Sequence, residues 1–391
     1  MKPRISLSAM TILFVTMFAG LVPPCQSQTL TVLHTFTGTP DGANPMVGVV
    51  RDGAGNLYGT TLNGGSAGFG TVYKLSPGGK ETVLYSFKGT PDGQNPYAGG
   101  LVRDSSGNLY GTTEVGGTAS QGTVYRVDHL GNETLLYSFT GGTDGGIPYA
   151  GVIRDSAGNL YGTTYFGGGT HNYGTVYKVD TAGNETLLRS FSGPPTDGKY
   201  SYGGLVRDAQ GNLYGTNYEG GFVGGGTVFK LAPNGNYKLL HSFKRNPDGQ
   251  LPFAGLTLSQ GNFYGTTISG GTFGFGTVYK LNNTGSETVL YSFSAGADGG
   301  LPNGGLVLDS AGNIYGTTYL GGAFGYGTVF RLDPSGNETV LYSFTGGADG
   351  KNPYFVVLLR DNAGNLYGTT SAGGGSGCGG SGCGTIFKLT P

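Results

Sequence analysis

The sequence predicts an all-β protein, a seven-bladed β-propeller with four antiparallel strands in each blade. Three observations lead to this prediction: one motif recurs seven times, each repeat holds four strand-like segments, and the two ends of the chain carry complementary parts of one repeat. The composition agrees, because the 391 residues include 81 Gly and 26 Tyr. Glycine at this frequency without a Gly-X-Y period, between Tyr, Thr, Val and Leu, favours short strands joined by tight turns.

The recurring motif is Gly-Asn-(Leu/Phe/Ile)-Tyr-Gly-Thr. The second repeat shows the four strand-like segments at residues 100–104, 108–113, 122–127 and 133–139, separated by Gly, Asp and Asn. Four strands in about fifty residues, repeated at a fixed period, are typical of a propeller blade. The seven motif tyrosines are Tyr58, Tyr110, Tyr161, Tyr214, Tyr264, Tyr315 and Tyr367.

The ends of the chain predict how the ring closes. The last repeat stops after its third segment, residues 384–389, whereas residues 30–36 stand alone and match the missing fourth segment. We therefore expect residues 30–36 to pair antiparallel with residues 384–389, which would leave no free strand edge at the seam. The propeller is expected to comprise residues 29–391 as one domain.

The N-terminus has the pattern of a secretory signal peptide. Lys2 and Arg4 precede an apolar stretch over residues 5–22, and a polar segment follows up to Gln28. We expect residues 1–28 to be removed, the protein to be secreted or periplasmic, and the mature chain to have no membrane span. A retained anchor or a lipid on Cys25 is a weaker interpretation, because hydroxyl residues interrupt the apolar stretch and Pro24 precedes the cysteine.

Charge and cysteine content narrow the functional classes. With 12% charged residues and a net charge of −1, the chain has no dense Lys/Arg field, so nucleic acid is not expected as a partner. Cys378 and Cys383 lie in a Gly/Ser-rich segment, and in an exported chain they predict a small disulfide rather than half of a zinc site.

The repeat also resembles a known family. The run Asp-Ser-Ala-Gly-Asn-Leu-Tyr-Gly-Thr-Thr, then Gly-Gly, then Gly-Thr-Val-Tyr-Lys-Leu, then Glu-Thr-Val-Leu-Tyr-Ser-Phe, resembles the GloVer tandem repeat of exported bacterial proteins over the whole mature chain. The resemblance implies an extracytoplasmic location and a propeller-like array. It implies no activity for any residue.

Candidate ligand-binding residues are found at positions that differ between blades, because the fold alone explains a position that is the same in all seven. Two such positions lie in the long loops that should share one face, and we expect their aromatic side chains to surround the mouth of the axial channel. Aromatic rings with hydroxyl edges suit sugar rings or flat organic ligands. The alternative is that these aromatic rings only cover the seams between blades. The predicted ligand-binding residues are Tyr97, Tyr149, Tyr202, Phe253 and Tyr354 at one position, and Tyr165, Tyr218 and Tyr319 at the other.

The leading functional hypothesis is a secreted, non-enzymatic propeller that binds an extracellular ligand, either a glycan or a surface protein, with a glycan as the preferred ligand. A polysaccharide-acting lyase or hydrolase that uses Glu114, Glu219 or His171 is one alternative, and a structural scaffold is another. No catalytic residue, cofactor or metal is predicted. His34 and His241 replace a tyrosine of the repeat and are interpreted as packing residues. The recurring Asp-Gly aspartates are interpreted as turn residues rather than Ca²⁺ ligands: Asp41, Asp92, Asp144, Asp197, Asp248, Asp298 and Asp349.

Overall fold

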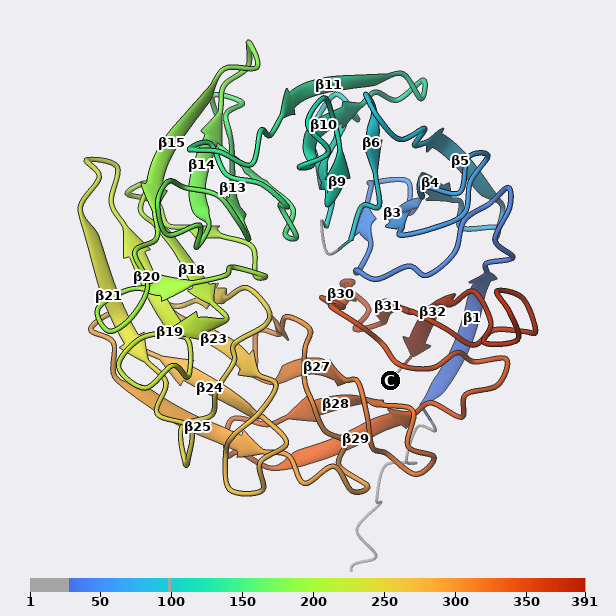
Figure 1. Cartoon of the computed structure of the whole chain (residues 1–391). Coiled ribbons are helices and arrows are strands. Elements are labelled where there is room, and N and C mark those ends of the chain that lie inside the picture. Colours follow the sequence, from blue (N-terminus) through green and yellow to red (C-terminus); the bar gives the residue numbers. More distant parts are fainter. Residues whose placement is uncertain (1–27, 98–99, 391) are drawn as a thin grey trace, which may run out of the picture.

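Seven four-stranded antiparallel sheets form a ring around a central axis (Figure 1). The computed structural model describes residues 28–97 and 100–390, and every regular element in these residues is a strand. None of the described residues belongs to a helix long and apolar enough to cross a membrane. The predicted seven-bladed propeller is therefore confirmed.

Each blade consists of four strands, named here from the axis outward as a, b, c and d. Blade 1 has β2 (Val50–Arg51), β3 (Leu57–Thr61), β4 (Thr71–Leu75) and β5 (Glu81–Ser86). Blade 2 has β7 (Val102–Arg103), β8 (Leu109–Thr113), β10 (Thr123–Val127) and β11 (Glu133–Ser138). Blade 3 has β12 (Ile153–Arg154), β13 (Leu160–Thr164), β14 (Thr175–Val179) and β15 (Glu185–Ser190).

The remaining blades repeat this order. Blade 4 has β17 (Val206–Arg207), β18 (Leu213–Asn217), β20 (Thr227–Leu231) and β21 (Tyr237–Ser242). Blade 5 has β22 (Thr257–Ser259), β23 (Asn262–Thr267), β24 (Thr277–Leu281) and β25 (Glu287–Ser292). Blade 6 has β26 (Val307–Leu308), β27 (Ile314–Thr318), β28 (Thr328–Leu332) and β29 (Glu338–Ser343). The closing blade has β30 (Leu359–Arg360), β31 (Leu366–Thr370), β32 (Thr385–Thr390) and β1 (Thr29–Thr35).

The closing blade joins the two ends of the chain. β1 pairs antiparallel with β32, from Thr29 opposite Thr390 to Thr35 opposite Thr385 (Figure 1). The register shifts between Val32 and His34, as it does in the c–d pairs of the other blades. The predicted closure is therefore confirmed, and no blade is left with an open edge at the seam.

The recurring Tyr-Gly-Thr-Thr segment is explained by packing within each blade. A Cβ on Gly59 would lie 2.3 Å from the hydroxyl of Tyr73, so only glycine lets the buried ring from strand c cross strand b. The second threonine faces a threonine on strand c, and the two hydroxyls of Thr61 and Thr71 lie 2.8 Å apart with no exposure to solvent. The Thr61 and Thr71 hydroxyls thus satisfy each other inside the blade, which avoids the cost of two unpaired polar groups, whereas the buried Tyr73 hydroxyl has no partner among the described residues.

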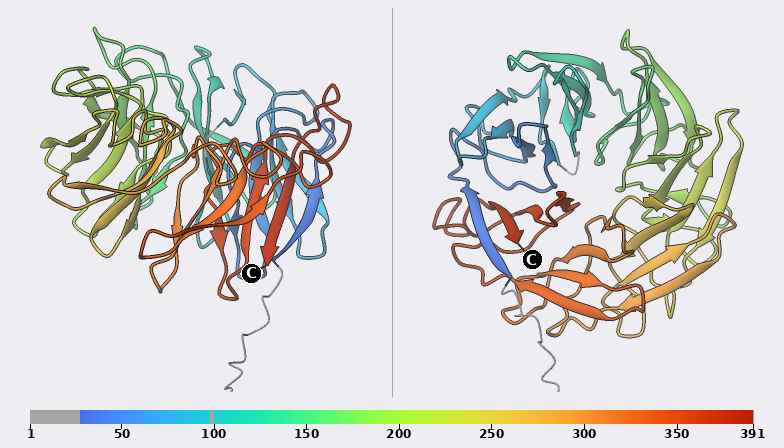
Figure 2. Two further views of the ribbon diagram at one scale, coloured as in Figure 1. Left: turned by 90° about the horizontal axis from the view of Figure 1, so that it is seen from below. Right: turned by 180° about the vertical axis from the view of Figure 1, so that it is seen from behind.

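The long loops form one face of the ring, which we call the loop face. The d–a and b–c loops pair with each other through β6 (Gly93–Gln94) with β9 (Val115–Gly116), and β16 (Gly198–Lys199) with β19 (Glu219–Gly220). Single bridges replace these small sheets in the other five blades. In the side view of Figure 2 the C-terminal end lies on the opposite side of the ring from these loops.

The predicted signal peptide lies almost entirely in residues 1–27, outside the described residues. Its cleavage therefore stays a prediction.

Candidate functional site

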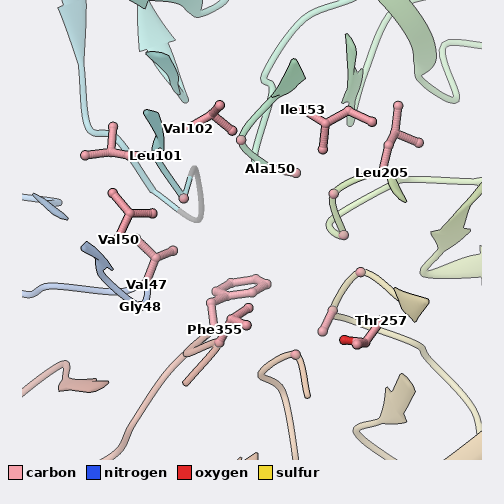
Figure 3. A pocket seen from close by; sticks show the side chains of 18 of the residues that line it. Val47, Gly48, Val50, Leu101, Val102, Ala150, Ile153, Leu205, Thr257 and Phe355 are labelled. Carbon is pink, nitrogen blue, oxygen red and sulfur yellow. The ribbon is translucent and has the colours of Figure 1, made fainter. Parts of the chain in front are cut away.

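An apolar cavity runs along the axis of the ring and has a volume of about 370 Å³ (Figure 3). The innermost strands and the residues just before them line it, among them Leu101, Ile153 and Leu205. The hydroxyl groups in the lining belong to Tyr202 and Thr257, and none of the lining residues is Asp, Glu, His, Lys or Arg. The cavity can therefore enclose an apolar group, but its walls supply no acid or base.

Phe355 closes the cavity toward the loop face. Its side chain is 6% exposed and points into the cavity in Figure 3. The ring stacks on Phe253 with a centroid distance of 4.4 Å and an interplanar angle of 18°, and it contacts Tyr97 edge-on at 5.7 Å. Val47 completes the buried part of this cluster. The aromatic ring of Phe355 thus acts as a plug at the centre of the channel mouth.

One extra residue in the closing blade places Phe355 on the axis. Six residues separate Pro353 from Arg360, and six also separate Pro96 from Arg103 in blade 2, whereas five separate Pro148 from Arg154 in blade 3. Phe355 takes a left-handed conformation with φ of 53°, which costs a non-glycine residue on the order of 1 kcal/mol. In five blades a strand-b threonine donates a hydrogen bond to the first carbonyl of the next blade's inner segment. The equivalent hydroxyls next to the two longer segments, those of Thr60 and Thr317, are buried without a partner among the described residues.

The eight predicted ligand-binding aromatics gather around Phe355, and we call these eight residues the aromatic collar. They form a connected series of rings across the blades: Tyr97 contacts Tyr149 at 5.1 Å, Tyr149 stacks on Tyr202 at 4.8 Å, and Tyr202 contacts Phe253 at 4.5 Å. Tyr354 connects Phe253 to Tyr97, and Tyr165, Tyr218 and Tyr319 join the series from the second loop position. The structure thus brings all eight residues together, and their role in ligand binding stays a prediction.

The collar rings are packed to different depths. Phe253 is 8% exposed and lies inside the cluster, whereas the seven tyrosines are half-buried. Burial and the neighbouring Tyr165 hydroxyl raise the pKa of Tyr202, and burial together with Tyr354 raises that of Tyr97. The collar therefore packs blade against blade, as the seam alternative requires, and also leaves part of each tyrosine at the surface.

A second group of aromatics extends the collar outward over blades 3 and 4. Tyr200 stacks on Tyr165 with a centroid distance of 4.8 Å and an angle of 22°, and Tyr173 contacts Tyr200 edge-on. The ammonium of Lys199 lies 4.9 Å from the Tyr200 ring centroid and 2.9 Å from the Glu219 carboxylate. This area combines flat rings with a charged pair that can donate and accept hydrogen bonds.

Exposed phenylalanines stand at the tips of three neighbouring b–c loops. Phe222, Phe273 and Phe324 are 69%, 59% and 58% exposed, in blades 4, 5 and 6. They were not predicted from the sequence. A comparison of the b–c loops would have found Phe273 and Phe324, because the corresponding residues in blades 1 and 2 are Ala67 and Ala119.

The acidic candidates for catalysis have separate partners. Glu114 is hydrogen-bonded by the Tyr149 hydroxyl, and burial raises the pKa of its carboxyl. Glu219 is paired with Lys199. His171 is exposed, stacks on Tyr173 at 5.6 Å and contacts the Thr170 hydroxyl. Each of the three groups is thus engaged locally, and none of them lines the axial cavity.

The other residues singled out in the sequence take local roles. The Asp-Gly aspartates accept hydrogen bonds from their own loops, as Asp92 does from the Lys88 amide at 2.9 Å. Cys378 and Cys383 are joined by a disulfide in the b–c loop of the closing blade.

The family model of the Gloeobacter/Verrucomicrobia repeat matches residues 21–222, 97–311 and 203–391, which together span the propeller. The chain belongs to this repeat family. No curated protein sequence matches this Gloeobacter/Verrucomicrobia repeat protein.

Solved structures share its fold at low sequence identity. A streptogramin B lyase is 15% identical with a TM-score of 0.59, and the match covers 93% of this chain and 97% of that one. The virginiamycin B lyase of Staphylococcus aureus is 13% identical with a TM-score of 0.60, over 93% and 99% of the two chains. An extracellular domain of BT4673 from B. thetaiotaomicron is 10% identical with a TM-score of 0.57, over 92% of this chain and 39% of that one. At these identities the likeness concerns the fold alone.

Proposed function

We propose that this repeat protein is an extracytoplasmic, non-enzymatic propeller that binds a glycan on its loop face. The observation that carries the proposal is that the collar tyrosines, Tyr200 and the exposed phenylalanines all belong to the loops of one face. Half-buried tyrosines supply rigid rings and hydroxyls, and the Lys199–Glu219 pair supplies charged hydrogen-bonding groups beside them. Sugars are recognised by this combination of stacking faces and a few fixed polar contacts.

The exposed phenylalanines support a ligand that extends beyond the collar. Three rings that are more than half exposed on adjacent loops form an apolar feature of the kind that marks an interaction site. A polymeric glycan can contact the collar and these loop tips at the same time. A small flat ligand would contact the collar alone.

Three further observations support the extracytoplasmic location. The N-terminal segment has the order of a signal peptide, and a Cys378–Cys383 disulfide persists in oxidising compartments. A structural neighbour is itself described as an extracellular domain.

A glycan array with the mature protein is the first experiment, followed by titration of the best glycan against two double variants. Phe273→Ala with Phe324→Ala should weaken binding by about 5- to 100-fold and leave Tm unchanged, because both rings are exposed. Tyr149→Ala with Tyr165→Ala should weaken binding to a similar extent and also lower Tm, because these rings pack on their neighbours.

Leu130→Ala provides the matched control, since Leu130 is 74% exposed in a c–d turn outside the loop face. It should change neither affinity nor Tm. Failure of the parent protein to bind any glycan, or unchanged affinity in both double variants, would overturn the proposal and leave the scaffold interpretation. Cleavage of the bound polysaccharide would support the lyase or hydrolase interpretation instead.

A further inference from the structure

The outer strands of neighbouring blades meet at the rim of the ring, and we call each meeting point a rim junction. β21 and β25 illustrate the arrangement, because they follow one another along the outer edge in Figure 1. A junction brings together a side chain near the end of one outer strand, the aspartate of the loop after that strand, and the first residue of the next outer strand.

The usual rim junction uses a tyrosine. The hydroxyl of Tyr85 donates to the Asp92 carboxylate at 2.8 Å, and Glu133 of the next blade lies close enough to affect both groups. Three other junctions show the same donor, with Tyr137, Tyr291 and Tyr342 bonded to their aspartates. In these four junctions the aspartate carboxylate therefore accepts a hydrogen bond from the tyrosine hydroxyl.

The junction between blades 4 and 5 is built differently. His241 replaces the tyrosine, and its Nε2 lies 3.3 Å from Oδ2 of Asp248. A ring nitrogen of His241, a carboxylate oxygen of Asp248 and a carboxylate oxygen of Glu287 all lie within 4.8 Å of one another. The imidazole and the two carboxylates come from two blades and converge on one point at the rim.

Two atoms of this junction lack a hydrogen-bond partner. Nε2 of His241 and Oε1 of Glu287 are both buried and make no hydrogen bond among the described residues. The corresponding Oε1 is also unpaired in Glu81, Glu133, Glu185 and Glu338, so the unpaired imidazole nitrogen is what distinguishes this junction. The ring of His241 is held by a contact with the Gly285 main chain, and the nearby positive group is the exposed Lys244. Buried lone pairs that face one another without donors are costly unless a cation satisfies them.

We propose that His241, Asp248 and Glu287 form a zinc-binding site that joins the outer strands of blades 4 and 5. One imidazole nitrogen and two carboxylate oxygens are ligands that Zn²⁺ accepts, and water supplies the remaining position of a tetrahedral site. The hard cations Ca²⁺ and Mg²⁺ prefer oxygen ligands alone, which makes the histidine the discriminating group. The site lies on the outer strands and is independent of the glycan proposal.

The chain contains its own comparison. His34, Asp41 and Glu81 repeat the three residue types at the junction between the closing blade and blade 1, and Nε2 of His34 again lies 3.3 Å from Asp41. These three do not form a group within 4.8 Å as the His241 group does. The structure thus offers one converged junction and one similar but looser junction.

The test uses untagged protein, freed of metal with EDTA and titrated with zinc chloride by calorimetry. The parent should bind zinc with one equivalent that is lost in His241→Tyr and retained in His34→Tyr. Tyrosine is the natural residue of four other junctions, so both variants should fold, and their Tm in EDTA checks this. Zinc at 100 times its Kd should raise the Tm of the parent by about 3 °C and leave that of His241→Tyr unchanged.

Glu287→Gln provides a second variant, which removes a charged ligand and keeps the side-chain volume. It should weaken zinc binding at least tenfold. The proposal is wrong if the parent binds no zinc, or if His241→Tyr binds as many equivalents as the parent with the same affinity.

Discussion

Replacement of Phe355 tests the role of the axial plug. The ring is 6% exposed and contacts Phe253, Tyr97 and Tyr354, so Phe355→Ala should destabilise the fold by about 3–5 kcal/mol, the usual cost of a buried Phe→Ala change. Phe355→Gly removes the same ring but also relieves the left-handed backbone at φ of 53°, by about 1 kcal/mol. The glycine variant should therefore be more stable than the alanine variant, although it lacks one more carbon atom.

Differential scanning calorimetry can resolve the two effects. With an unfolding entropy of roughly 2 cal/mol/K per residue, 1 kcal/mol corresponds to about 1.3 °C in a propeller of this length. Phe355→Ala should lower Tm by about 4–6 °C, and Phe355→Gly by about 1 °C less. Leu130→Ala, a truncation at an exposed turn, should cause no change. A Phe355→Ala shift no larger than that of Leu130→Ala would refute the packing argument, and a Tm lower for Gly than for Ala would refute the backbone argument.

Three further predictions concern the seam, the disulfide and the rim. Deletion of residues 29–37 removes β1 and leaves β32 as a free edge, so light scattering should show aggregation that the parent lacks; a stable monomer would contradict the closure argument. Mass spectrometry of the unreduced protein should show Cys378 and Cys383 linked, and two free thiols would exclude the disulfide. Between pH 4.5 and 7, with EDTA present, Tm should fall as pH rises, because the unfolded chain releases protons that the folded rim glutamates still hold. A variant with three of these glutamates changed to glutamine should show a shallower fall in Tm. A fall equal to that of the parent would contradict the role of these glutamates. Burial, reinforced by a nearby aspartate, raises the pKa of these glutamates from 4.5 to about 7: Glu133, Glu185 and Glu338.

The fold could be predicted from the sequence because the same pattern of strand-forming and turn-forming residues recurs in all seven repeats. Gly59, for example, is required wherever a strand-c ring crosses strand b, so the motif keeps a glycine there in every blade. The isolated strand-like segment at residues 30–36 could then pair only with the last repeat, which lacks a fourth strand. The collar could be located in the same way, since loop positions next to the innermost strands must lie near the axis.

Phe355 was missed because it belongs to an insertion rather than to the repeat. Tyr354 occupies the position after the proline that varies between blades, and the extra residue alters the backbone between Tyr354 and strand β30. The number of residues between Pro353 and Arg360 indicates a longer inner segment, as the same number between Pro96 and Arg103 does in blade 2. The position of the ring, however, depends on a left-handed backbone that the local sequence does not require, since Phe is unfavourable in that conformation.

The rim junction was missed for a different reason. Asp248 was interpreted as a turn residue and His241 as a packing residue that replaces a tyrosine, each inside its own repeat. Glu287 belongs to the next blade, and it reaches Asp248 only because the outer strands meet end to end around the ring. A repeat protein places its specific chemistry where one blade departs from the others and where two blades touch. His241 satisfies both conditions, because it replaces the tyrosine of the repeat and faces a carboxylate that its own blade does not supply.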